Sequence, residues 1–214
     1  MLPTIHTFVL GDYQTNCFVV TVPGTADCWI VDCGFEPDDM LDWIEQQQLR
    51  PIALLLTHAH SDHMAGIDAA MSRFGPMPLY IHEAEAEWCS NPMLNLSGLI
   101  GRPVTATRPD HLLKGGETLE LAGTHWRVLH TPGHSPGGVC YVNDESRQAL
   151  VGDVLFAGSI GRVDFPTSNP AAMRRTLREV MMNLPDDLTI YPGHGPATTI
   201  GRERRSNPYI IGGF

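Results

Sequence analysis

The feature that most constrains the fold is a set of short apolar runs, rich in β-branched residues and bounded by Gly, Pro or Asp. Runs of this kind predict strands, and several are apolar enough to be buried on both faces. They are TFVL, CFVVTV, CWIVDCG, IALLLTH, PLYIH, ETLEL, WRVLHTPGH, GVCYV, ALVGD and LTIYPGH. Strands therefore account for much of the expected core.

Amphipathic stretches between these runs predict helices. Residues 36–48 (EPDDMLDWIEQQQ), 62–74 (DHMAGIDAAMSRF) and 169–184 (NPAAMRRTLREVMMNL) each place apolar side chains on one face. Strands in two blocks, each covered by helices, predict a layered α/β sandwich. A doubly wound parallel sheet is the competing architecture. It requires helices between nearly all strands, whereas residues 111–153 lack them and are expected to be antiparallel.

Composition limits the possible partners and the compartment. The 214 residues suit one domain spanning 1–214, and the formal net charge of -10 argues against nucleic acid or an anionic membrane as a partner. The five cysteines are scattered without a CxxC pair, and the start MLPTIHTFVLGDY has neither a basic leader nor a long apolar run. We therefore expect a cytoplasmic protein without disulfides, acting on a small molecule. The oligomeric state stays open.

The stretch THAHSDH at 57–63 follows the apolar run IALLL. His58 and His60 are two residues apart in an extended segment, so both rings emerge on one side and can share a metal ion. Asp62 and His63 begin the next predicted helix, which turns them towards a neighbouring position. Packing three imidazoles and a carboxylate so closely has no structural benefit, and the pattern therefore indicates a metal site.

Three further strand ends carry residues of the same kind. His134 and His194 lie in the Gly-flanked stretches PGHSPGG and PGHGP, and Asp153 follows ALVG. Glycine lets the backbone approach a crowded centre, and Asp153 is the candidate for a carboxylate that bridges two metals. The isolated histidines are instead interpreted as structural: His6, His82, His111, His125 and His130.

In this order, the motifs resemble the metallo-β-lactamase superfamily. VDCG around Asp32 is similar to that superfamily's early acidic motif, which supports the metal loops without binding metal. TPGHSPGG, GDVLFAGSIGRVDFP and YPGHGPATTIGRERRSNPY resemble the compact bacterial members of the glyoxalase II (hydroxyacylglutathione hydrolase) group. The resemblance covers about residues 5–209.

This resemblance implies a four-layer αββα sandwich with a two-metal site in a cleft at one edge. One metal would be held by His58, His60 and His134. The other would be held by Asp62, His63 and His194, with Asp153 bridging the two. Donor atoms of this kind suit zinc, and also iron or manganese.

The implied activity is hydrolysis of a hydroxyacyl thioester by a metal-bound hydroxide. Two divalent ions lower the pKa of a shared water and stabilise the developing oxyanion, while Asp62 orients the attacking oxygen. Arg162 in AGSIGRVDFP is expected to bind a substrate carboxylate, and a surface ion pair with Asp164 is the alternative. Gly195 and Pro196 replace an acidic residue and a tyrosine of larger glyoxalase II enzymes, so glutathione itself is not specified.

Other functions on the same residues remain open. A persulfide dioxygenase would use one iron held by His58, His134 and Asp153. A lactone or other ester hydrolase would use both metals. A binding protein with a vestigial site is disfavoured, because the sequence lacks none of the expected ligands.

Overall fold

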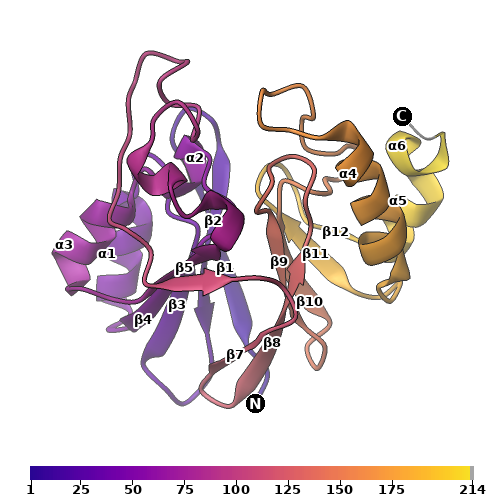
Figure 1. The fold of residues 1–214 in the computed structure, drawn as a ribbon. Coiled ribbons are helices and arrows are strands. Elements are labelled where there is room, and N and C mark those ends of the chain that lie inside the picture. The colour runs from indigo at the N-terminus through magenta and orange to yellow at the C-terminus, as the bar shows by residue number, and fades with distance from the viewer. Residues whose placement is uncertain (213–214) are drawn as a thin grey trace.

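The computed structural model describes residues 1–212 as two sheets packed face to face, with helices on both outer faces (Figure 1). The first sheet contains, in spatial order, β1 (Thr4–Leu10), β2 (Thr15–Thr21), β3 (Asp27–Val31), β4 (Arg50–Leu55), β5 (Leu79–His82) and β6 (His111–Leu113). The second contains β12 (Thr198–Thr199), β11 (Thr189–Pro192), β10 (Gln148–Gly152), β9 (Val139–Asn143), β8 (Thr124–His130) and β7 (Thr118–Leu121). This is the predicted αββα sandwich.

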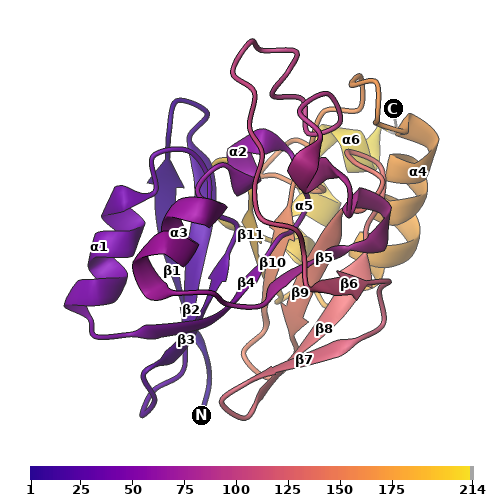
Figure 2. The ribbon, with the colours of Figure 1, turned by 60° about the vertical axis from the view of Figure 1, so that its left-hand side comes forward.

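Each sheet carries its helices on the face that points away from the other sheet (Figure 2). The first sheet is covered by α1 (Asp38–Gln46) and α3 (Ile67–Phe74), preceded by the short α2 (Ser61–Met64). Two 3-10 turns follow β5, η1 (Glu83–Glu85) and η2 (Trp88–Ser90). The second sheet is covered by α4 (Pro170–Arg175), its continuation through η3 (Thr176–Val180) and η4 (Met181–Asn183), α5 (Ile200–Ser206) and α6 (Pro208–Ile211).

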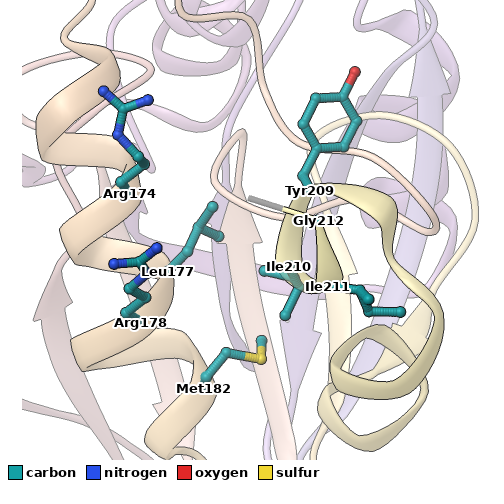
Figure 3. A pocket seen from close by; sticks show the side chains of 8 residues that line it. All are labelled: Arg174, Leu177, Arg178, Met182, Tyr209, Ile210, Ile211 and Gly212. Atoms are coloured by element: carbon teal, nitrogen blue, oxygen red, sulfur yellow. The ribbon is translucent and has the colours of Figure 1, made fainter. Parts of the chain in front are cut away.

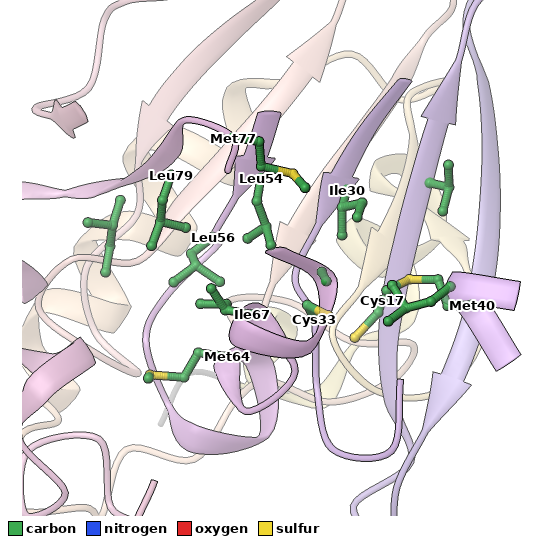
Figure 4. Close-up of a cluster of buried hydrophobic side chains, with 14 of the residues drawn as sticks. Cys17, Ile30, Cys33, Met40, Leu54, Leu56, Met64, Ile67, Met77 and Leu79 are labelled. Carbon is green, nitrogen blue, oxygen red and sulfur yellow. The ribbon is translucent and has the colours of Figure 1, made fainter. Parts of the chain in front are cut away.

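Alternation along the strands divides the core into layers. On β2, Cys17 and Val19 pack towards α1 and α3, whereas Phe18 and Val20 pack against the second sheet. Figure 4 shows the outer layer, where Ile30, Leu54 and Leu56 lie near Ile67 and Met64. All five cysteines are buried with free thiols, and burial raises the pKa of Cys33, as expected for a small buried side chain. Among residues 1–212, no helix is long and apolar enough to span a membrane.

Two local expectations are wrong. The stretch 62–74 is not one helix, because it is interrupted at Ala65–Gly66. A Cβ on Gly66 would lie 2.7 Å from Cys33 Sγ, so the close packing of this turn against the loop after β3 requires glycine. In 111–153, β7 to β10 are antiparallel as predicted, but β6 pairs in parallel with β5. The chain changes sheets between β6 and β7, so β6 has no hairpin partner.

Strand direction brings the carboxyl ends of several strands, among them β3, β4, β8, β10 and β11, to one end of the sandwich. In the first sheet β3 and β4 are parallel. In the second sheet β9 lies antiparallel between β8 and β10, and β11 is parallel to β10, so β8, β10 and β11 all run the same way. Loops that follow such strand ends meet at one edge and can build a common site.

Tyr141 connects the two sheets directly beneath this edge. Its buried hydroxyl donates a hydrogen bond of 2.7 Å to the carbonyl oxygen of Leu56. Tyr141→Phe is expected to lower the free energy of unfolding by about 1–2 kcal/mol, because a buried acceptor loses its donor. Urea unfolding followed by circular dichroism measures this loss. Tyr191→Phe, which removes a half-buried hydroxyl that accepts from Gln148 at 3.2 Å, is the control and should cost less. Equal losses would contradict the sheet-linking role.

Candidate metal centre

The side chains predicted to bind metal lie together at the carboxyl ends of β4, β8, β10 and β11. They form three overlapping groups whose ligand atoms are within 4.8 Å of one another: His58, His60 and His134; His58, His63 and Asp153; Asp62, His63 and His194. The first and third groups have the same members as the two predicted ligand sets. The histidines interpreted as structural lie outside all three groups, and His6, for example, contacts Thr21 Oγ1 at 3.0 Å.

Asp153 lies between the first and third groups. Its Oδ2 is 3.4 Å from His134 Nε2 and 3.6 Å from His194 Nε2, and its Oδ1 is 3.6 Å from His63 Nε2. The carboxylate therefore faces imidazoles of both sets. This is the position that the bridging prediction requires.

Hydrogen bonds on the far side of the rings determine which nitrogen faces the centre. His134 Nδ1 is 2.8 Å from the carbonyl oxygen of Arg162, and His194 Nδ1 is 3.2 Å from that of Tyr13. His63 Nδ1 is 2.9 Å from a carboxylate oxygen of Asp32. Each of these oxygens can only accept, so each Nδ1 carries a hydrogen, and Nε2 is the nitrogen that faces the centre and offers a lone pair when the ring is neutral.

Two of these Nε2 atoms face a carboxylate oxygen, which also carries lone pairs. His194 Nε2 is 3.3 Å and His63 Nε2 is 3.5 Å from Asp62 Oδ2. His63 Nε2 and Asp153 Oδ1 are buried and have no hydrogen-bond partner among the described residues. Acceptors that face one another in a buried site are unfavourable unless a cation lies between them. The arrangement therefore fits divalent metal ions.

In the group of His58, His60 and His134, the ring nitrogens also converge. His60 Nδ1 is 3.1 Å from His58 Nε2 and 2.8 Å from His134 Nε2. Three ring nitrogens that point at one location, without a thiolate among them, suit zinc, iron or manganese. Burial, followed by the neighbouring imidazoles, lowers the pKa of His58 well below its usual value, which keeps the ring neutral and able to bind a metal.

In the third group, neighbouring carboxylates raise the pKa of a histidine instead of lowering it. Burial alone would lower the pKa of His63, but Asp62, Asp32 and Asp153 outweigh it and raise the pKa to about 10. Burial alone would raise the pKa of Asp62, but His63 and His194 hold it well below its usual value. The carboxylates that stabilise a proton on His63 would stabilise a metal cation in its place.

Asp32 supports the centre from behind. It is fully buried; its Oδ1 accepts from the Thr57 backbone N–H at 2.8 Å, and its Oδ2 accepts from the Thr57 hydroxyl at 2.7 Å and from His63. Because the Thr57 hydroxyl hydrogen points to Asp32, its oxygen is free to accept from His58 Nδ1 at 3.2 Å. Asp32 thereby orients His63 directly and His58 through Thr57.

The supporting role of two residues was not recognised from the sequence. Glu85 is fully buried, and its carboxylate accepts from the backbone N–H groups of Ala59 and Gly137, each at 2.6 Å. It ties the loop that carries His60 to the loop that follows His134. Its surroundings, HEAEAEW, look like an exposed acidic stretch, so no local signal distinguishes Glu85 from the exposed Glu83 and Glu87.

Asn16 is the second such residue. Its amide donates to the carbonyl oxygens of Pro192 and Gly195, each at 2.8 Å, and so fixes the loop that carries His194. Gly193 in this loop is required by space, because a Cβ there would lie 2.7 Å from His63 Cε1 and would overlap Asp153. The predicted reason for the flanking glycine, a close approach to the centre, applies at this position.

A cavity of about 370 Å³ opens above the centre. His60, Asp62, His134, Asp153 and His194 contribute to its lining, as does Arg162. The Arg162 guanidinium makes two hydrogen bonds of 2.8 Å to Asp164 and lies 4.3 Å from the centre of the Phe165 ring. The structure thus forms the surface ion pair given as the alternative for Arg162, and also places this residue on the cavity wall.

A second cavity, of about 170 Å³, lies on the outer side of the second sheet (Figure 3). Arg174, Arg178 and Met182 line it from the α4–η4 helix, opposite Tyr209 and Ile210 of α6. None of the candidate metal ligands contributes to it. This second cavity is therefore separate from the candidate centre.

Comparison with known proteins agrees with this geometry. The family model of the metallo-beta-lactamase superfamily matches residues 10–194. The chain is 36% identical over 204 residues to "Probable metallo-hydrolase YqgX" of Bacillus subtilis, covering 95% of both chains. It is 34% identical over 200 residues to "Hydroxyacylglutathione hydrolase GloC" of Haemophilus influenzae, covering 92% and 93%. The chain belongs to the metallo-β-lactamase superfamily.

Solved structures give the same assignment. The crystal structure of BLEG-1, a B3 metallo-β-lactamase, matches with a TM-score of 0.92 at 38% identity, covering 97% of this chain and 99% of that one. TTHA1623 in a di-iron-bound form matches with a TM-score of 0.80 at 33% identity, covering 95% and 99%. Members of this superfamily bind divalent metals, and the di-iron relative keeps iron among the candidate ions.

Asp153→Asn tests the position of this carboxylate between the two groups. The amide keeps the shape but removes the charge that would offset two cations, so both predicted metal positions should lose affinity. The loss should exceed the roughly 10–100-fold cost of altering an outer partner of a ligand. Elemental analysis after dialysis should find less than one ion per chain in the variant, whereas the exposed control Asp187→Asn retains the full content. Unchanged metal content in Asp153→Asn would exclude the bridging role.

Proposed function

We propose that this metallo-hydrolase of the metallo-β-lactamase superfamily hydrolyses hydroxyacyl thioesters, with two divalent ions held by the residues of the candidate centre. His58, His60 and His134 would hold one ion and Asp62, His63 and His194 the other, with Asp153 between them. Zinc is our first choice, and the same donors accept iron or manganese.

The observation that carries the proposal is the convergence of seven imidazole and carboxylate side chains, five of which line the floor of one cavity. A single tetrahedral ion uses four ligands, so seven exceed what one ion needs. The relative named hydroxyacylglutathione hydrolase, 34% identical over nearly the whole chain, supports a thioester as the substrate class. A persulfide dioxygenase with one iron would leave Asp62, His63 and His194 without a role.

Bound divalent ions supply a lowered pKa of coordinated water and withdraw charge from the carbonyl oxygen. The chain provides orientation. Asp62 accepts a hydrogen bond of 3.0 Å from the Thr15 hydroxyl, which fixes a carboxylate that lines the cavity and can orient the attacking water. The water oxygen, which gives up one proton to solvent, forms a bond to the acyl carbon. The carbon–sulfur bond breaks with its electron pair on sulfur, and the products are the hydroxy acid and the thiolate. Because thiols have a pKa of about 8.5, the leaving group needs no proton from a side chain.

The test is a substrate panel with the metal-loaded full chain. We expect release of thiol and hydroxy acid from a hydroxyacyl thioester, loss of turnover on chelation, and recovery when zinc is returned. A lactone, a β-lactam and a glutathione persulfide with an oxygen electrode complete the panel. Oxygen consumption on the persulfide with one iron per chain would establish the dioxygenase function. Turnover of the lactone or β-lactam without the thioester would also contradict the proposal.

We propose that Arg162 binds a carboxylate in the thiol part of the substrate. The substrate carboxylate would take the place of Asp164 on the guanidinium. Its side chain is 65% exposed, so screening limits the gain, and Arg162→Ala should raise KM for a carboxylated thioester about five-fold. A neutral thioester should be unaffected. Arg202→Ala, which removes an equally exposed arginine outside the cavity, is the control. Equal changes on charged and neutral substrates would leave Arg162 with only a structural role.

A further inference from the structure

The cavity above the candidate centre has two chemically different parts. Its floor consists of the candidate metal ligands. Its upper wall is largely apolar, with side chains from three separate segments of the chain: Tyr13, Leu96, Ile100, Phe156, Ile160 and Phe165. None of the six is a candidate metal ligand, although Phe165 packs against the rings of His60 and His134, and Phe156 packs against that of His194. The wall therefore also shapes what the cavity can accommodate.

The three segments surround the same opening. Tyr13 lies in the turn between β1 and β2, Leu96 and Ile100 lie in the segment 91–110, and the others lie in the segment 153–169. Figure 1 shows the segments 91–110 and 153–169 rising above the same end of the sandwich. A molecule that reaches the ions must therefore pass between their apolar side chains.

Two of these side chains are exposed. Tyr13 is 47% and Ile100 is 48% exposed, although both lie beside a buried polar centre. Exposed apolar side chains at the mouth of a cavity are typical of a ligand-binding site, because a ligand can cover them. Arg162 is the one Lys or Arg side chain in the lining, and Asp164 compensates its charge. The rest of the upper wall offers a substrate apolar contact and hydroxyl groups.

We infer that the site selects hydroxyacyl thioesters whose acyl group carries an apolar chain or an aromatic ring, rather than a single methyl group. This inference rests on the proposed function. With the carbonyl at the floor, the acyl substituent would lie against Ile100 in the segment 91–110, and the thiol part would extend towards Arg162 and Phe165. Burial of each added methylene on this wall should raise kcat/KM by about two- to four-fold until the wall is covered.

The experiment uses a series of 2-hydroxyacyl thioesters on one small neutral thiol, N-acetylcysteamine, with the acyl substituent varied from methyl to propyl, pentyl and phenyl. The metal-loaded wild-type chain should show kcat/KM rising along the series. Ile100→Ser should lower kcat/KM for the pentyl and phenyl substrates by about three- to ten-fold and change the methyl substrate by less than two-fold. Leu99→Ser is the matched control, because Leu99 is adjacent, 55% exposed and outside the cavity lining.

Binding of the free 2-hydroxy acids, measured by calorimetry, separates this inference from the proposed function. Affinity that rises with the size of the substituent, and loses that rise in Ile100→Ser, supports the apolar subsite even if no thioester is hydrolysed. Hydrolysis with equal kcat/KM along the series and no affinity gain would overturn the subsite and leave the proposed function standing. A maximum at the methyl substrate would overturn it as well.

Discussion

The arrangement of the candidate centre depends on one buried carboxylate, that of Asp32. It stands at the end of β3 with φ 58, in a left-handed backbone conformation that a non-glycine residue adopts only when its surroundings hold it there. Its N–H donates to the Leu55 carbonyl at 2.9 Å, and its side chain accepts from Thr57 and His63. One residue thus joins the ends of two parallel strands and sets the orientation of imidazoles in both proposed ligand sets.

Three other buried side chains also hold the segments around the centre by hydrogen bonds. Glu85 joins two loops through backbone N–H groups, Asn16 fixes the loop of His194, and Tyr141 anchors the end of β4 to the second sheet. Each bond replaces water around a polar group that folding buries, and so helps to fix the position of a loop. Preorganisation of this kind lets a buried, negatively charged centre bind cations without rebuilding its surroundings.

Local sequence patterns are sufficient to predict the candidate ligands. The spacing of His58, His60, Asp62 and His63 after an apolar run is a local signal, and the strand ends before His134, Asp153 and His194 are also readable. Glu85 is not readable, because its partners are 26 and 52 residues away and only the folded sheets bring them together. The parallel pairing of β6 and the break at Gly66 likewise depend on contacts with distant segments. For Arg162 the sequence left two possibilities, and the ion pair with Asp164 and the place on the cavity wall occur together.

The central claim is that the seven converging side chains make a centre for two cations. The most direct measurement is the number of divalent ions bound per chain, determined by elemental analysis of the full-length protein after loading and extensive dialysis. The account predicts two ions per chain, with imidazole nitrogen and carboxylate oxygen as their ligands. One ion per chain, or none, in a protein that retains its native circular dichroism spectrum would contradict it.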